Sequence, residues 1–237
     1  MLRLHKPVIT RFTSYHLVNN ELLRDMLNDN GANSLTGRDN ERYNWGSDAD
    51  WVPYVQAALE AYARPSDDWE EHPTGDRDSY AAPLGHGTDE ASAPTVIILS
   101  SGAHWSTLRL DGAEDPKIIE DTFASVVAYT TVRLKALPRA NLHLRILART
   151  NPPPMDDCLN ATEPLDPPNL VPPASNFNYE SFPVFDDVWR NNPSIEVLDL
   201  RPLVGTRPDG RRMPRPDCLH VCIPVARSWV EVLWNVL

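Results

Sequence analysis

An acid, two thiols and an imidazole lie within six consecutive residues near the end of the chain, in the order Asp217, Cys218, Leu219, His220, Val221, Cys222. Groups of these types in close spacing bind a metal ion, form a redox-active thiol pair, or supply the acid–base half of a hydrolase. The segment directly precedes an apolar stretch that contains two tryptophans and predicts a helix. The three chemistries differ in the spacing that they require.

Acid–base chemistry fits Asp217 and His220, which are three residues apart at the entrance to the last predicted helix. The carboxylate is close enough to accept a hydrogen bond from one imidazole nitrogen, which fixes the tautomer and leaves the other nitrogen to take a proton from a hydroxyl nucleophile. The other interpretation is a surface aspartate and a partly buried histidine that cap the helix. The D-x-x-H spacing alone does not decide between them.

A metal site and a redox pair fit the spacing less well. Cys218, His220 and Cys222 form a tight local group, but no second C-x-x-C or H-x-x-H motif completes four ligands. A thioredoxin-like pair requires C-x-x-C at a helix start, whereas the spacing here is C-x-x-x-C. We therefore predict no metal ion.

Composition limits the partners of the chain. Its 237 residues carry a formal net charge of -11, which argues against nucleic acid or an anionic membrane surface and favours a neutral or cationic substrate. No run approaches the roughly 18 apolar residues of a membrane span, and the opening MLRLHKPVITRF lacks the apolar stretch of a signal peptide. We expect a soluble chain that forms one domain over residues 1–237.

Apolar runs alternate with helical patterns along the chain. Buried strands are predicted at 95–101, 142–148 and 195–200, and helices at 21–29, 51–63, 117–137, 179–190 and 228–237. Polar or proline-rich loops are predicted at 65–93 and 151–175. This order predicts an α/β domain with a parallel sheet covered on both faces, in which functional residues follow the carboxyl end of each strand.

The segments after these strands carry a family resemblance. DCLHVCIPVARSWVEVLWNVL resembles the C-terminal signature of the PC-esterase family, GDSL/SGNH-like proteins that include the plant trichome-birefringence-like polysaccharide O-acetyltransferases and the acyltransferase part of Cas1-type proteins. VIILSSGAHW, LARTNPPPMDDC and IEVLDLRPLVGTRPDG resemble three upstream blocks of that family, in the same order. The resemblance runs from about Arg42 to Leu237.

The resemblance implies a three-layer αβα, SGNH-hydrolase-like (flavodoxin-like) domain with a central parallel sheet. It also implies an O-acetyltransferase or acyl esterase that acts on glycan acetyl esters, with an acetyl donor such as acetyl-CoA or an acetylated glycan and no other cofactor. A serine would attack the ester, His220 would act as base and then as acid, and Asp217 would orient it. The family implies a secretory location, Golgi or extracellular, and its full-length members usually carry an N-terminal membrane anchor.

Further substrate contacts are implied after the first two strands, at Gly102, His104, Trp105 and Arg149. The backbone N–H of Gly102 would stabilise an oxyanion, although the glycine is equally explained by a tight turn. Trp105 is either a packing residue or a stacking surface for a sugar. The family has histidines where this chain has Pro154-Met155 and Arg211, so some substrate contacts differ.

The nucleophile is the main departure, because the family's G-D-S motif does not occur in this chain. If ITRF is the remnant of that block, Lys6-Pro7-Val8 replaces G-D-S, and the first strand is missing or degraded; we favour this register. In the other register, FTSYHLVNNELL is the block and Ser14 is the nucleophile. The alternative function is a catalytically inactive relative or fragment, such as a glycan-binding scaffold.

The resemblance also bears on the thiols, because secretory conditions are oxidising and three cysteines should not all be free there. Cys158 and Cys218 both follow predicted strands at the same end of the sheet, so we predict a disulfide between them, with Cys222 unpaired. The triplet Asn160-Ala161-Thr162 is a glycosylation sequon, which agrees with a secreted glycoprotein.

Overall fold

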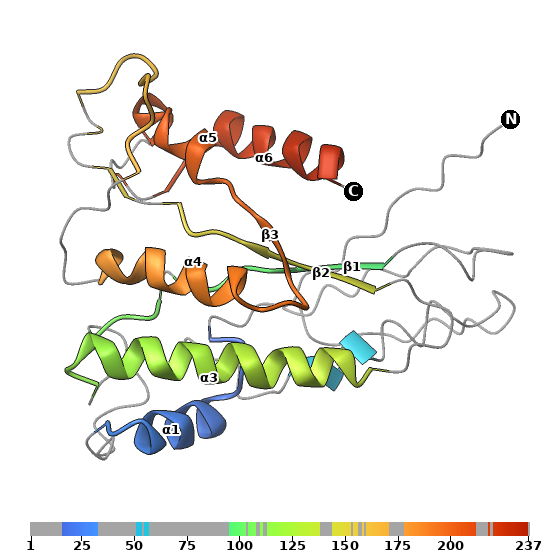
Figure 1. Cartoon of the computed structure of the whole chain (residues 1–237). Coiled ribbons are helices and arrows are strands. Elements are labelled where there is room, and N and C mark those ends of the chain that lie inside the picture. The colour runs from blue at the N-terminus through green and yellow to red at the C-terminus, as the bar shows by residue number, and fades with distance from the viewer. Residues whose placement is uncertain are drawn as a thin grey trace, which may run out of the picture.

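The computed structural model describes residues 16–32, 51–56, 95–137, 144–170 and 178–236, apart from positions 54, 103, 108–109, 111–112, 153, 156–157, 159, 212–217 and 219. Its longer elements are α1 (Asn20–Asp29), β1 (Thr95–Leu99), α3 (Pro116–Lys135), β2 (Leu144–Arg149), α4 (Phe182–Arg190), β3 (Glu196–Leu198) and α6 (Ile223–Val236) (Figure 1). Short helices η2 (Tyr179–Ser181), α5 (Arg201–Gly205) and η3 (Pro208–Arg211) connect them. The predicted loop 65–93 lies outside the described residues.

The three strands form one parallel sheet in the order β1-β2-β3, which confirms the predicted strand direction. Ile97 of β1 is opposite Ile146 of β2, and Ala148 of β2 is opposite Val197 of β3. Each strand is within a few residues of its predicted position. Because β2 pairs on both sides, it is the centre of the described sheet.

One face of the sheet packs against α3, with α1 and α4 beside it (Figure 1). α3 begins at the side-chain cap of Asp115, which accepts from the N–H of Lys117, and it buries eight side chains: Ile119, Thr122, Phe123, Val126, Val127, Thr130, Thr131 and Leu134. Phe123 is fully buried, and its ring contacts those of Trp105, Phe185 and Trp189 at centroid distances of 4.5–5.4 Å. This aromatic cluster connects α3, α4 and the loop after β1.

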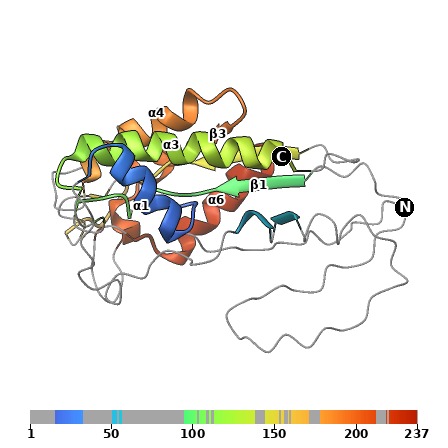
Figure 2. The same cartoon turned by 90° about the horizontal axis from the view of Figure 1, so that it is seen from below.

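The opposite face of the sheet is covered by α6, as the two views agree (Figures 1 and 2). Arg145 of β2 donates to the carbonyl of Val236, and the guanidinium of Arg149 lies 5.0 Å from the ring centroid of Trp229. α6 begins at Ile223, five residues earlier than predicted, because a proline in the first turn of a helix loses no hydrogen bond. The described part is therefore an α/β arrangement with helices on both faces.

The described part of the predicted loop 151–175, residues 151–170 with its gaps, contains no helix or strand. Its chain passes the carboxyl ends of the strands and contacts α5, since the N–H of Asn169 donates to the carbonyl of Gly205. Across all described residues, no helix combines the length and the hydrophobicity needed to cross a membrane.

Candidate site at the carboxyl edge of the sheet

A glycine turn follows β1 at the edge where the site was predicted. Gly102 has φ of +143°, a conformation that side chains rarely adopt, and its carbonyl accepts from the N–H of Trp105 at 2.9 Å. A Cβ at this position would lie 2.3 Å from Nδ2 of Asn151. Both the backbone and the space therefore require glycine. Within the described part of the chain, the Gly102 N–H has no hydrogen-bond acceptor.

Asn151, two residues after β2, holds this turn in place. Its side-chain Nδ2 donates to the carbonyl of Ser101 at 3.1 Å, and its backbone N–H donates to Oδ1 of Asp186 at 3.2 Å. Asn151 is 3% exposed and Asp186 is fully buried. The loop after β1 is thus connected through Asn151 to a carboxylate on α4.

Asp186 is a buried acid, and only one of its two carboxylate oxygens accepts a hydrogen bond from a described residue. Its Oδ2 makes no hydrogen bond to a described residue and lies 3.4 Å from Nη1 of Arg201. Burial raises the pKa of Asp186 to about 6, although the Asn151 N–H and the charges of Arg201 and Arg190 oppose the rise. The nearby charge of Asp199 adds to it.

Asp199, after β3, has the opposite character. Burial alone would raise its pKa, but hydrogen bonds from Arg201 and from the Thr150 hydroxyl outweigh burial and hold the pKa at about 2. The hydroxyl of Thr150 also accepts from the N–H of Leu200 at 2.9 Å. These contacts join the ends of β2 and β3 and keep Asp199 ionised.

The aromatic residue of this edge is structural. Trp105 is 0% exposed, its Nε1 donates to the Ser101 hydroxyl at 2.9 Å, and its ring contacts Phe123 and His16. A fully buried ring is not accessible to a sugar, so its burial favours the packing interpretation of Trp105 over the sugar platform. Burial also lowers the pKa of His16 to about 4, so this imidazole is neutral at pH 7.

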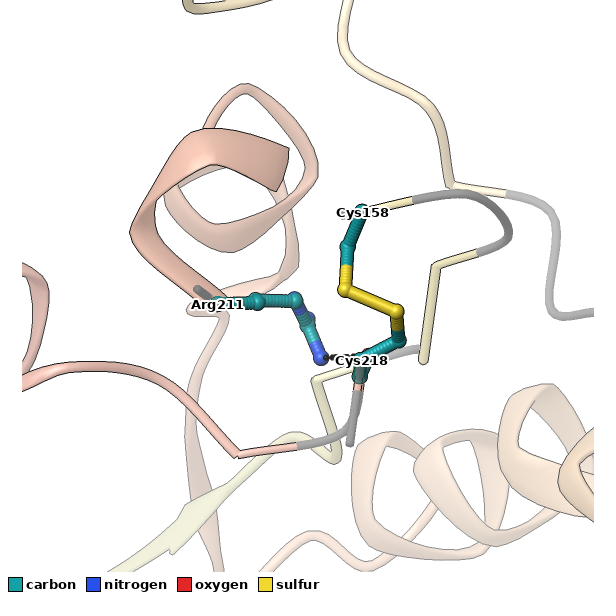
Figure 3. Close-up of a disulfide and its surroundings, with 3 residues drawn as sticks. All are labelled: Cys158, Arg211 and Cys218. Atoms are coloured by element: carbon teal, nitrogen blue, oxygen red, sulfur yellow. Dashed lines mark hydrogen bonds between the residues drawn. A yellow bond between two sulfur atoms is a disulfide. The ribbon is translucent and has the colours of Figure 1, made fainter. Parts of the chain in front are cut away.

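Cys158 and Cys218 form the predicted disulfide, with their Cα atoms 5.4 Å apart (Figure 3). The carbonyl of Cys218 accepts from the N–H of Met155 at 3.1 Å and from Nη1 of the buried Arg211 at 2.9 Å. Met155 and Arg211 thus both donate to the backbone of one cysteine of the bridge. Cys222 is a free, half-buried cysteine.

The fold places some of the predicted site residues, but not all of them, at the carboxyl edge of the sheet. Gly102 and Arg149 lie at the carboxyl edge of the sheet, and half-buried His104 follows Gly102 in the same loop. His220 is exposed and lies two residues beyond Cys218, so the disulfide links its segment to the loop after β2. Two predicted members of the triad, Asp217 and Ser14, lie outside the described residues, as does the ITRF segment of the favoured register.

Asn151 and Asp186 were not predicted from the sequence as residues of this edge. Asp186 occurs in a helix whose buried residues are Phe182, Phe185 and Trp189, and a carboxylate at that spacing falls on the apolar face. This placement was a usable signal of a buried acid. Asn151 had no such signal, because its role depends on a contact with a residue far away in the sequence.

The described residues contain no group of three or more His, Cys, Asp and Glu side chains that could hold a metal ion. Comparison of the chain with protein-family models, with curated proteins and with solved structures finds no match.

Proposed function

We propose that this domain processes acyl esters of glycans, as a carbohydrate O-acetyltransferase or an acyl esterase of the SGNH type. The observation that carries the proposal is the combination, at one sheet edge, of a glycine turn and a disulfide. The turn presents an N–H that has no acceptor among the described residues, and the disulfide links the D-C-x-H segment to that edge. Ligands of parallel α/β sheets bind at this edge.

In this mechanism His220 takes a proton from a hydroxyl nucleophile and then returns it to the leaving oxygen. Asp217 orients the imidazole, and the Gly102 N–H stabilises the negative charge on the tetrahedral intermediate. Transfer and hydrolysis differ only in whether a sugar hydroxyl or water accepts the acyl group. An acetylated glycan or acetyl-CoA would serve as the donor.

A glycan-binding scaffold without catalysis is the second candidate. The observation that favours it is the lack of a G-D-S motif anywhere in the 237 residues. Both candidates place the chain in the secretory pathway, and the Cys158–Cys218 bridge supports an oxidising compartment.

Hydrolysis of 4-nitrophenyl acetate by the wild type and by the variants Ser14→Ala and His220→Ala tests the mechanism. Ser125→Ala, on the exposed side of α3, is the matched control. In the favoured register, where Lys6-Pro7-Val8 replaces G-D-S, we expect turnover near the uncatalysed rate, because loss of a nucleophile removes several orders of magnitude. Only the register in which Ser14 is the nucleophile gives this chain an active esterase. Binding of an acetylated oligosaccharide without turnover would then support the scaffold.

Robust turnover that Ser14→Ala and His220→Ala both abolish, and Ser125→Ala does not, would identify Ser14 as the nucleophile and establish the esterase. Turnover that survives both substitutions would exclude the proposed mechanism.

A further inference from the structure

Arg149 differs from the other arginines of its surroundings in what it binds. It is the last residue of β2, and its Nε and Nη2 both donate to the hydroxyl of Ser100, at 3.1 and 2.6 Å. Its guanidinium lies over the ring of Trp229 on α6. The Nε and Nη2 donors of an arginine normally bind the two oxygens of a carboxylate, whereas here both bind a single neutral hydroxyl.

Arg145 gives the comparison, because it lies four residues earlier in β2, on the same face of the sheet. Its Nε and Nη2 bind the two carboxylate oxygens of Glu196, at 3.0 and 2.6 Å. Arg201 and Arg207 also hold carboxylates, those of Asp199 and Asp209. Arg149 has no such partner among the described residues.

The guanidinium of Arg149 is half-buried, so it is only partly hydrated. Burial lowers the pKa of Arg149, and only the charge of Asp186 opposes this effect. Charges that are removed from water are normally paired with an opposite charge, so a half-buried guanidinium that holds no carboxylate is a candidate to bind an anion. Within the part of the chain that the structure describes, Nη1 of Arg149 has no acceptor.

Trp229 provides an independent observation. Its indole N–H is buried and has no acceptor among the described residues, while its ring carries the guanidinium of Arg149. Buried donors normally find acceptors in the protein, in water or in a ligand. Ser100, whose hydroxyl accepts from the same guanidinium, is exposed and thus connects this position to solvent.

We propose that Arg149, Trp229 and Ser100 form a binding site for a small organic carboxylate at the carboxyl edge of the sheet. A carboxylate is planar, has acceptors only, and can use both the free Nη1 of Arg149 and the indole N–H. The ligand is either a free acid, such as the acid released from an ester, or the acidic group of a uronic sugar. The site exists independently of the proposed acyl-ester chemistry, because no nucleophile is involved.

Titration of the ¹⁵N-labelled full chain at constant ionic strength tests the site. The indole N–H resonance of Trp229, assigned through Trp229→Phe, is the readout. We expect acetate to shift this resonance with saturation, whereas acetamide, its neutral isostere, leaves it in place. Glucuronate that shifts the resonance at lower concentration than acetate identifies a sugar acid as the ligand class, and the reverse order identifies a free acid.

Arg149→Gln should abolish the saturable shift, and Arg149→Lys should weaken acetate affinity by about tenfold or more, because an ammonium cannot reproduce the fork. Arg145→Gln, which removes the arginine already paired with Glu196, is the control and should leave the affinity unchanged. A well-dispersed spectrum of each variant establishes that it is folded. Equal shifts by acetate and acetamide, or equal loss in the Arg145 and Arg149 variants, would overturn the proposal.

Discussion

Asp186 is a buried carboxyl group whose ionisation lowers the stability of the fold. Its carboxyl is fully buried on α4, and burial raises its pKa to about 6, above the value of about 4 for an exposed aspartate. Between these two values the folded chain holds a proton that the unfolded chain releases, so this group makes stability fall as the pH rises from about 4 to about 6. Above pH 6 the full penalty is present.

Asp186→Asn should remove this penalty, because an amide does not ionise and its oxygen still accepts from the Asn151 N–H. Relative to the wild type, the free energy of unfolding of the variant should rise by up to about 3 kcal/mol between pH 4 and pH 7. Urea unfolding across this range measures it. Asp187→Asn, next in sequence with a side chain 64% exposed, is the control and should follow the wild type. Parallel profiles of Asp186→Asn and wild type would contradict the prediction.

Gly102 is constrained in two separable ways, by its φ and by the side chain of Asn151. Gly102→Ala should cost about 3 kcal/mol or more, the sum of a strained backbone and a steric overlap. Gly31→Ala is the matched control, because Gly31 has φ of +94° but a Cβ added there would meet no atom within 4 Å, so it should cost about 1 kcal/mol. Chemical denaturation of both variants measures the difference, and equal losses would show that the overlap with Asn151 is relieved without cost.

At the scale of elements, the disulfide is what attaches the segment before α6 to the loop after β2. The two cysteines are 60 residues apart, so the bridge closes a long ring. The ring contains α4, β3 and α5, and the bridge therefore restricts the unfolded state of this whole part of the chain.

Replacing Cys158 and Cys218 together by serine should lower the free energy of unfolding by about 4 kcal/mol in the chain-entropy model. Cys222→Ser removes a thiol without removing a bridge and should have little effect. Thermal unfolding of the three proteins under non-reducing conditions gives the comparison. Peptide mapping that joins Cys158 to Cys222 would contradict the assignment.

The helices and strands could be predicted from the sequence more accurately than the residues at which they begin and end. The strand types followed from apolar runs such as TVIIL, but β1 ends at Leu99, two residues early, because the polar Ser100-Ser101 pair already leads into the Gly102 turn. α6 began earlier than its apolar pattern because Pro224 is tolerated in a first turn. Local hydrogen bonding decides the residue at which a helix or strand begins or ends, and the spacing of apolar residues carries no information about it.

At the scale of the molecule, the two faces of the sheet are buried unequally. α3 buries eight side chains, whereas Val230 and Val236 of α6 are 52% and 41% exposed, and Ile98 of β1 is 44% exposed. The polar contacts at the carboxyl edge of the sheet could not be predicted from the sequence. Contacts such as Asn151 with Ser101 arise only when strands distant in the chain become neighbours.

Unequal burial predicts unequal local stability. In native-state hydrogen exchange, amides of β2 and of α3 around Phe123 should exchange last, and those of α6 should exchange earlier through opening of that layer. Mass spectrometry of peptides covering 117–135 and 225–236 compares the two helices within one sample. Equal protection in both would show that α6 opens only with the whole molecule.

The contact between Gly102 and Asn151 also limits which substitutions evolution can accept at these two positions. Because the amide of residue 151 occupies the volume that any side chain at residue 102 would need, neither position can vary freely alone. Homologues that depart from glycine at the first position should carry a smaller residue at the second and replace the lost bond to residue 101. Correlated substitution at these two sites would therefore mark true relatives of this chain even where overall identity has faded.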